Sequence, residues 1–134
     1  MSAPRPLPRL EPDNRFFWTS GEDGKLRFLQ CSDCKTFLHP PRPICFNCLS
    51  ENVAPAVVPG TGVVDTFTIN HQKWSPTMEV PFIIARVAID GAPGVILTTN
   101  IIDCPVGAVE FGDKVVVSFE QQDDVWLPLF KKVV

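Results

Sequence analysis

Two Cys-x-x-Cys pairs constrain the fold of this 134-residue chain more than any other feature of its sequence. They read Cys31-Ser-Asp-Cys34 and Cys45-Phe-Asn-Cys48, and ten residues separate them. The two-residue gap lets both sulfurs of one loop reach a single ion, and two such loops supply the four sulfurs of a tetrahedral zinc site. We therefore predict one zinc ion, with iron as the alternative occupant, bound by these four cysteines. Four thiolates fill the coordination sphere, so we expect a structural site rather than a catalytic one.

The same cysteines could instead form a dithiol redox pair or disulfides. A redox pair would open a helix in a thioredoxin-like unit, and nothing in the sequence resembles one. The first ten residues lack the apolar core of a secretory signal, so we expect a cytoplasmic protein, in which disulfides are uncommon. The longest charge-free run, residues 52–64, is broken by two prolines and is too short to cross a bilayer, so no membrane partner is expected.

The remaining cysteine, Cys104, lies outside this pattern, between an aspartate and a proline. A nucleophilic thiol needs a neighbouring base, and His39 and His71 are the only histidines in the chain. We therefore interpret Cys104 as a small buried hydrophobic residue, His39 as at most a spare ligand, and His71 as a surface residue. Because phosphate-binding and serine-hydrolase motifs are also absent, we predict no catalytic residue and interpret the chain as a binding or scaffolding module.

The sequence divides into three expected parts. Residues 1–24 form a proline-rich arm and a short helix, residues 25–56 form the zinc ribbon, and residues 57–134 form a β-barrel. Prolines at positions 4, 6, 8 and 12 favour extended backbone in the arm. Asp13 is the expected N-cap of the helix, which carries Phe16, Phe17 and Trp18 and ends near Gly21 or Gly24.

Short β-rich runs separated by turn residues dominate the rest of the chain. One strand is expected at residues 25–30. The barrel strands are expected at residues 61–72, 81–90, 94–103, 114–121 and 125–133. Five strands without a strong helix predict a mainly β fold whose C-terminal part is a five-stranded OB-fold barrel. Alternation of apolar residues predicts that its core includes Val64, Phe67, Ile69, Ile84, Val87, Ile96, Val115, Val117 and Phe119.

The charge distribution bears on possible partners. The chain carries a net charge of −3, and its barrel segment holds five basic residues against nine acidic ones. Zinc ribbons and OB-folds both occur in proteins that bind single-stranded nucleic acid, so such a module is the alternative function. That function requires a basic groove with aromatic side chains for stacking, and the acidic barrel argues against it. The proline arm, the aromatic cluster and the proline-rich ribbon tip instead predict a surface for a protein partner.

The order of these features resembles a known family, the rubredoxin-like zinc ribbon plus OB-fold once labelled domain of unknown function thirty-five. The resemblance covers nearly the whole chain. It rests on Phe17-Trp18, Gly24-Lys-Leu26, the two cysteine pairs, His39-Pro-Pro-Arg-Pro43 between them, and Gly60-Thr-Gly62-Val-Val64 at the start of the barrel. Lys35 stands where the family usually has glycine, and Phe46 stands where proline is common. Neither departure removes a metal ligand.

The resemblance implies a function. Members of this family are similar to small partner subunits of thiolase-superfamily enzymes and of some acyl-CoA hydratases, acting in the degradation of sterol side chains or aromatic acids. It implies that the catalytic residues belong to the partner, and that this chain stabilises the complex and helps to hold the acyl-CoA. Arg42 and Lys35 could then meet acidic partner residues or coenzyme A phosphates, although a merely solvated role is the alternative.

Overall fold

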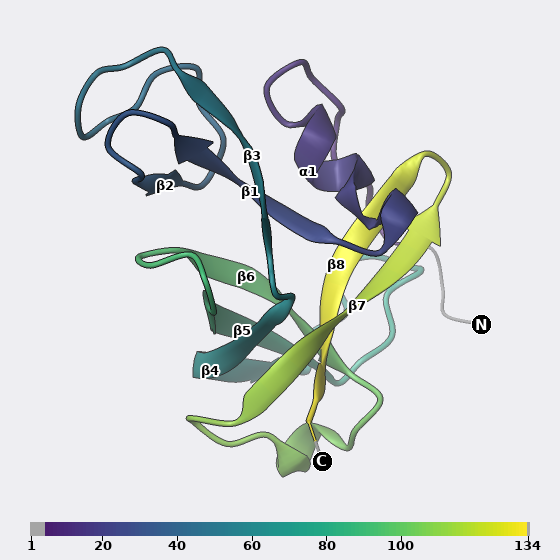
Figure 1. The fold of residues 1–134 in the computed structure, drawn as a ribbon. Coiled ribbons are helices and arrows are strands. Elements are labelled where there is room, and N and C mark those ends of the chain that lie inside the picture. The colour runs from purple at the N-terminus through teal and green to yellow at the C-terminus, as the bar shows by residue number, and fades with distance from the viewer. Residues whose placement is uncertain (1–4, 134) are drawn as a thin grey trace.

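The computed structural model describes residues 5–133, so Pro4 of the predicted arm lies outside the described part of the chain. The fold is mainly β, with one short helix near the N-terminus (Figure 1). The elements in chain order are helix α1 (Arg15–Thr19), the 3-10 turn η1 (Ser20–Asp23), β1 (Leu26–Cys31), β2 (Phe37–Leu38), β3 (Val53–Val58), β4 (Thr61–Asn70), β5 (Phe82–Ile89), β6 (Ile96–Ile102), the 3-10 turn η2 (Val106–Ala108), β7 (Lys114–Gln122) and β8 (Val125–Lys132). No helix in residues 5–133 is long and apolar enough to cross a membrane.

The strands form two sheets. The first has the order β2-β1-β3, and the second closes into a barrel with the order β4-β5-β6-β8-β7. The five barrel strands fall on the five predicted segments, which confirms the ribbon plus five-stranded barrel. Strands β2 and β3 were not predicted. Pro55 makes the sequence of β3 look unlike a strand. It lies opposite Leu29 on an edge strand, where a missing backbone N–H is tolerated.

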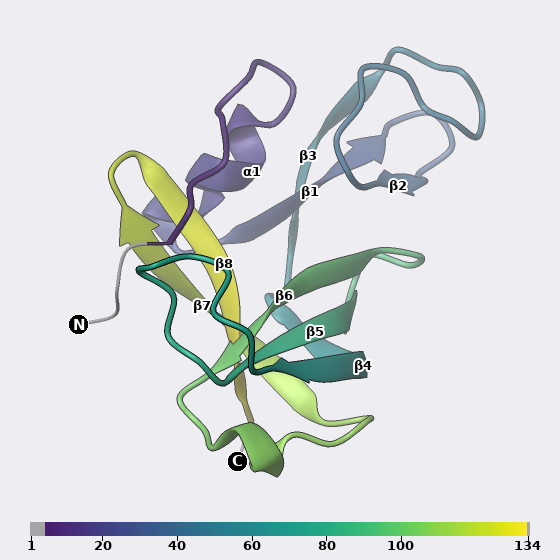
Figure 2. The same cartoon turned by 180° about the vertical axis from the view of Figure 1, so that it is seen from behind.

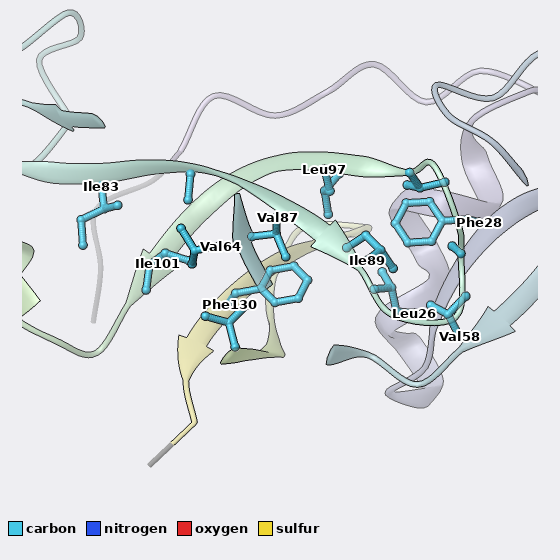
Figure 3. Packing of buried hydrophobic residues seen from close by; sticks show 14 of the residues in the cluster. Leu26, Phe28, Val58, Val64, Ile83, Val87, Ile89, Leu97, Ile101 and Phe130 are labelled. Carbon is cyan, nitrogen blue, oxygen red and sulfur yellow. The ribbon is translucent and has the colours of Figure 1, made fainter. Parts of the chain in front are cut away.

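The two sheets share one hydrophobic core. Strand β3 leads from the ribbon directly into the barrel (Figures 1 and 2). Leu26 and Phe28 of β1 and Val58 of β3 are buried in the same cluster as the barrel residues Val87 and Ile89 (Figure 3). Because ribbon side chains complete the packing of the barrel, the position of the ribbon relative to the barrel is fixed by burial of apolar surface.

The predicted core is partly correct. Val64, Val87 and Val115 are buried in this cluster, and Phe67, Val117 and Phe119 are half-buried and pack against it. Ile69, Ile84 and Ile96 are corrections. Ile69 and Ile84 are half-buried and lie outside the cluster, whereas Ile96 is 37% exposed and its neighbour Leu97 is buried instead. Strands β5 and β6 carry isoleucines in adjacent positions, so their apolar pattern does not reveal which face is inward.

The N-terminal helix begins one residue later than predicted. Asn14, not Asp13, is the N-cap, and its side chain accepts a hydrogen bond from Glu11 N instead of capping the helix. The helical segment ends at Gly24, which has a φ of 77°. The aromatic cluster faces inward, because Phe17 is buried and Phe16 and Trp18 pack against the shared core. It is therefore not the free docking surface that the sequence suggested.

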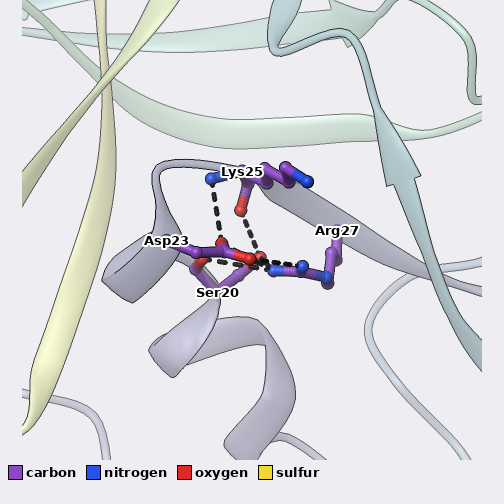
Figure 4. A network of polar contacts seen from close by, with 4 residues as sticks. All are labelled: Ser20, Asp23, Lys25 and Arg27. Atoms are coloured by element: carbon purple, nitrogen blue, oxygen red, sulfur yellow. Dashed lines mark hydrogen bonds and ion pairs between the residues drawn. The ribbon is translucent and has the colours of Figure 1, made fainter.

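An ion pair fixes the turn between η1 and β1 (Figure 4). Arg27 Nη2 donates to Asp23 Oδ2 at 2.7 Å and Nη1 donates to Oδ1 at 3.0 Å. The Asp23 carboxylate also accepts a hydrogen bond from Lys25 N, and the Ser20 hydroxyl donates to the Lys25 carbonyl. The side-chain hydrogen bonds from Arg27 lower the pKa of Asp23 to about 2. These bonds hold the helical segment against the first ribbon strand.

Candidate metal centre and apolar cleft

The ribbon brings together the four cysteines of the two Cys-x-x-Cys pairs. Their sulfurs all lie within 4.8 Å of one another, and the Cys31–Cys48 and Cys34–Cys45 Sγ pairs are each 3.6 Å apart. A tetrahedral ion with Zn–S bonds of about 2.3 Å separates its sulfurs by about 3.8 Å. The donor set and its spacing therefore fit a four-coordinate zinc. Within residues 5–133 no other cluster of cysteine, histidine or acidic side chains could hold a metal.

The two cysteine loops have the same backbone form. In the first, Lys35 N donates to Cys31 O and Cys31 N donates to Thr36 O, both at 2.9 Å. In the second, Leu49 N donates to Cys45 O and Cys45 N donates to Ser50 O, again at 2.9 Å. The residue after each pair is left-handed, with a φ of 67° at Lys35 and 63° at Leu49. This explains why glycine suits the Lys35 position, because a side chain is strained there.

The surroundings shift the pKa values of Cys34 and Cys48 in opposite directions. Hydrogen bonds with the Thr36 and Asn47 side chains lower the pKa of Cys34 to about 5. At Cys48 the Ser50 N–H favours the thiolate, but desolvation and hydrogen bonds with the other three sulfurs outweigh it and raise the pKa to about 12. The protein alone therefore disfavours a thiolate at Cys48. A divalent cation bound by the four sulfurs would supply compensating positive charge.

The other singled-out residues lie apart from the sulfur cluster. His39 is packed between aromatic rings, 5.0 Å from the Phe17 centroid and 5.1 Å from that of Phe28, and burial lowers its pKa. His71 is exposed in the loop between β4 and β5. Cys104 is half-buried in a shallow depression whose lining in the described chain contains no histidine. His39 is thus a packing residue rather than a spare ligand, and Cys104 has no imidazole base beside it.

A second feature, not found from the sequence, is a cleft of about 440 Å³ between the N-terminal arm and the barrel. Arg5 anchors the arm at its edge, donating from Nε to Glu120 Oε2 at 2.8 Å and from Nη1 to Asn100 Oδ1 at 2.9 Å. The described arm therefore lies on the chain's own barrel. Apolar side chains dominate the rest of the lining. They come from α1, the β4–β5 loop, the start of β5, β6 and β8: Phe17, Trp18, Met78, Phe82, Leu97, Leu127 and Leu129.

The cleft exists because two barrel strands diverge. Strands β6 and β8 run parallel and are paired only at Ile101–Phe130 and Ile102–Lys131. Beyond these pairs the two strands have no registered pairing, and residues 97–100 and 127–129 line the cleft. The buried Thr99 hydroxyl donates to Pro128 O at 2.7 Å and links the two strands there. Sequence reasoning missed this site because its lining is drawn from five separate segments, none of which carries a motif.

Comparison with known proteins bears on both features. The ChsH2 rubredoxin-like zinc ribbon domain family matches residues 18–54, and the ChsH2 C-terminal OB-fold domain family matches residues 56–120. A probable enoyl-CoA hydratase alpha subunit of Thermomonospora curvata is 32% identical over 133 residues, which are 98% of this chain and 41% of that protein. The 3-oxo-4,17-pregnadiene-20-carboxyl-CoA hydratase alpha subunit of Mycobacterium tuberculosis is 31% identical over 83 residues, covering 62% of this chain and 26% of that protein. The chain thus spans less than half the length of these curated relatives.

Solved structures extend the comparison. A chain of the Ltp2-ChsH2(DUF35) aldolase superposes with a TM-score of 0.86 at 29% sequence identity, covering 96% of this chain and all of that one. A DUF35 protein of unknown function from Sulfolobus solfataricus superposes with a TM-score of 0.63 at 19% identity, over 91% of this chain and 86% of that one, which shows a shared fold. Because the two ChsH2 domain families match in order over residues 18–54 and 56–120, and the ChsH2(DUF35) neighbour covers 96% of the chain, the chain belongs to the zinc-ribbon and OB-fold family called domain of unknown function thirty-five.

Proposed function

We propose that this chain is a non-catalytic subunit of a thiolase-superfamily enzyme that cleaves a carbon–carbon bond in an acyl-CoA by a retro-aldol reaction. The observation that carries the proposal is its likeness, over 96% of its length, to a chain of the Ltp2-ChsH2(DUF35) aldolase. The two curated relatives are named as hydratase subunits, so an acyl-CoA hydratase is the second candidate partner.

The chemistry of the described residues supports a non-catalytic role. The four clustered sulfurs leave no open ligand position on a tetrahedral ion. His39 is half-buried against aromatic rings, and the depression that holds Cys104 contains no histidine in the described chain. A nucleophilic thiol needs a base within hydrogen-bond reach, and a general base must be able to reach the substrate proton. The reacting groups are therefore assigned to the partner.

The four cysteines, Cys31, Cys34, Cys45 and Cys48, are proposed to hold one structural zinc. When bound, the ion supplies charge compensation for the thiolates and cross-links the two ends of the ribbon. Elemental analysis of the purified chain should find one zinc per molecule, and Cys45→Ser should lose it. A folded ribbon without stoichiometric metal would contradict this assignment.

The apolar cleft is proposed to hold part of the acyl group while the partner performs the chemistry. Its volume of about 440 Å³ and mostly apolar lining are typical of small-molecule sites. Met78 lies in the lining, whereas nearby Val80 is exposed in the same loop and is not part of it. Met78→Glu should raise KM for the acyl-CoA in the complex without changing kcat, and Val80→Glu serves as the matched control.

The decisive experiment mixes the chain with the Ltp2-like protein of the same organism. We expect a stable complex by size exclusion with light scattering, and acyl-CoA cleavage by the complex but not by this chain alone. A parallel mixture with an acyl-CoA hydratase subunit tests the second partner. Cleavage by this chain alone, or failure to bind either protein, would overturn the proposed function.

A further inference from the structure

The two cysteine loops of the ribbon share a backbone form but present different side chains. Ser32 and Lys35 occupy the exposed positions of the first loop, and Phe46 and Leu49 occupy the same positions of the second. Phe46 is 55% exposed and Leu49 is 75% exposed. The preceding Ile44 is also exposed. One loop is therefore polar at its tip and the other is apolar.

Folding does not explain the apolar tip. The first loop shows that serine and lysine satisfy the same backbone geometry. A leucine at a φ of 63° is strained, and an exposed leucine gains little from burial. Lys35 bears the same strain in the first loop, so position 49 differs by exposing an apolar side chain that the isolated ribbon does not need. An exposed apolar cluster of this kind indicates that the side chain is covered in the assembled protein.

Charge indicates what covers it. The Arg42 guanidinium lies over the Phe46 ring, 5.5 Å from its centroid. Within residues 5–133 neither Arg42 nor Lys35 forms an ion pair with an acidic side chain. A guanidinium stacked on a ring keeps its N–H groups free to bind a carboxylate at the edge. A guanidinium beside an apolar tip is complementary to an apolar hollow bordered by aspartate or glutamate.

We propose that Ile44, Phe46, Leu49 and Arg42, here called the second-loop surface, dock into an acidic-rimmed apolar hollow on the thiolase-type partner. This inference rests on the proposed function and identifies the surface through which the chain would act. Figures 1 and 2 place the segment between β2 and β3, which carries this surface, at the end of the molecule opposite the C-terminus. The surface is therefore accessible while the shared core and the cleft remain intact.

The test replaces the second tip with the first. The double variant Phe46→Ser/Leu49→Lys copies side chains that the same backbone already carries in the first loop, so zinc content and thermal midpoint should not change. We expect its affinity for the Ltp2-like protein to fall at least about thirtyfold, the effect of losing an interface hot spot. Arg42→Gln should weaken binding less and reduce its salt dependence. Trp74→Ser, at a tryptophan 74% exposed in the β4–β5 loop, is the control and should bind as the wild type does.

The outcomes are distinguishable. If the wild-type chain binds neither the Ltp2-like protein nor the hydratase, the proposed function fails. If it binds and the double variant binds equally well, or if Trp74→Ser loses as much affinity, the docking surface is wrong. A wild-type dimer that the double variant converts to monomer would assign the surface to a second copy of this chain and overturn the inference. Should the double variant lose its zinc, Leu49→Asn alone replaces it, because asparagine tolerates a positive φ.

Discussion

The ribbon and the barrel are stabilised in different ways, although one chain of 134 residues forms both. The separate ribbon cluster contains four buried residues, Leu29, Cys31, Leu38 and Cys45, and two of these are proposed metal ligands. The barrel cluster contains sixteen, three of which come from β1 and β3. So small an apolar cluster cannot offset the loss of chain entropy by itself. We therefore expect the ribbon to depend on the proposed metal and on its attachment to the barrel, whereas the barrel depends on packing.

The largest expected effect would separate the two modules. Removing the metal with a chelator, or changing the fully buried Cys45 to serine, should unfold the distal ribbon, because structural zinc contributes on the order of 10 kcal/mol to folding. Hydrogen exchange should lose protection in residues 31–53 and keep it in β4–β8. Cys104→Ser is the control and should leave both modules protected. Simultaneous loss of barrel protection would show that the modules do not differ as described.

A smaller change should break both modules together. Phe28 is fully buried in the shared core, and its ring contacts those of Phe17 and His39. Phe28→Ala should lower the free energy of unfolding by about 3–5 kcal/mol. Hydrogen exchange measured at increasing urea concentrations should show that β1–β3 and β4–β8 lose protection together. Both should do so at a lower urea concentration than in the wild type. Val57→Ala, at an exposed position on the neighbouring strand, should change little. A ribbon-only effect of Phe28→Ala would contradict the shared core.

The next change should act on the barrel alone. A Cβ atom at Gly62 would lie 2.5 Å from Val87 Cγ1 and 2.7 Å from the Ala88 carbonyl oxygen. Gly62→Ala should therefore force β4 away from β5 and destabilise the barrel by about 1–3 kcal/mol, the usual range for overpacking. Gly107→Ala meets no atom within 4 Å and is the matched control. Urea unfolding of both variants measures the difference, and equal midpoints would refute the steric argument.

The smallest expected effect is a gain confined to the ribbon. Lys35→Gly removes a strained side chain at a φ of 67°. Because glycine also increases the entropy of the unfolded chain, the net stabilisation should be about 0.5–1 kcal/mol. The chelator concentration that half-unfolds the ribbon should rise, and exchange in the barrel should not change. Ser32→Gly, in the same loop but without a positive φ, should be neutral or destabilising.

Much of the fold could be predicted because its signals are local. The cysteine spacing predicted the ribbon, and alternating residues such as Val115 and Val117 predicted the barrel strands. Strand β3 was missed because proline normally argues against a strand. Pro55 is tolerated because β3 is an edge strand, and its place in the sheet cannot be read from the local sequence. Ile84 and Ile96 were assigned to the wrong face because their strands are apolar on both sides.

The site was less predictable for a similar reason. The four sulfurs lie close in sequence, so their clustering follows from spacing alone. The cleft does not, because it forms only when residues as distant as Arg5 and Leu129 meet across the barrel. Phe46 is exposed and Phe17 is buried, although both are phenylalanines. The difference arises from tertiary contacts, which the sequence alone does not show.

The barrel is closed between β6 and β8 by fewer registered residue pairs than join any other two neighbouring barrel strands. Strands β4 and β5 are joined by eight registered residue pairs, so the loss of any single bond leaves the others in place. Strands β6 and β8 have two registered pairs, and the Thr99 hydroxyl adds one bond to a proline carbonyl. Failure at this joint would open the cylinder into a curled sheet with two free edges. Core packing stabilises the barrel as a whole, but its closure at this joint is held by only a few hydrogen bonds that lie directly beside the cleft.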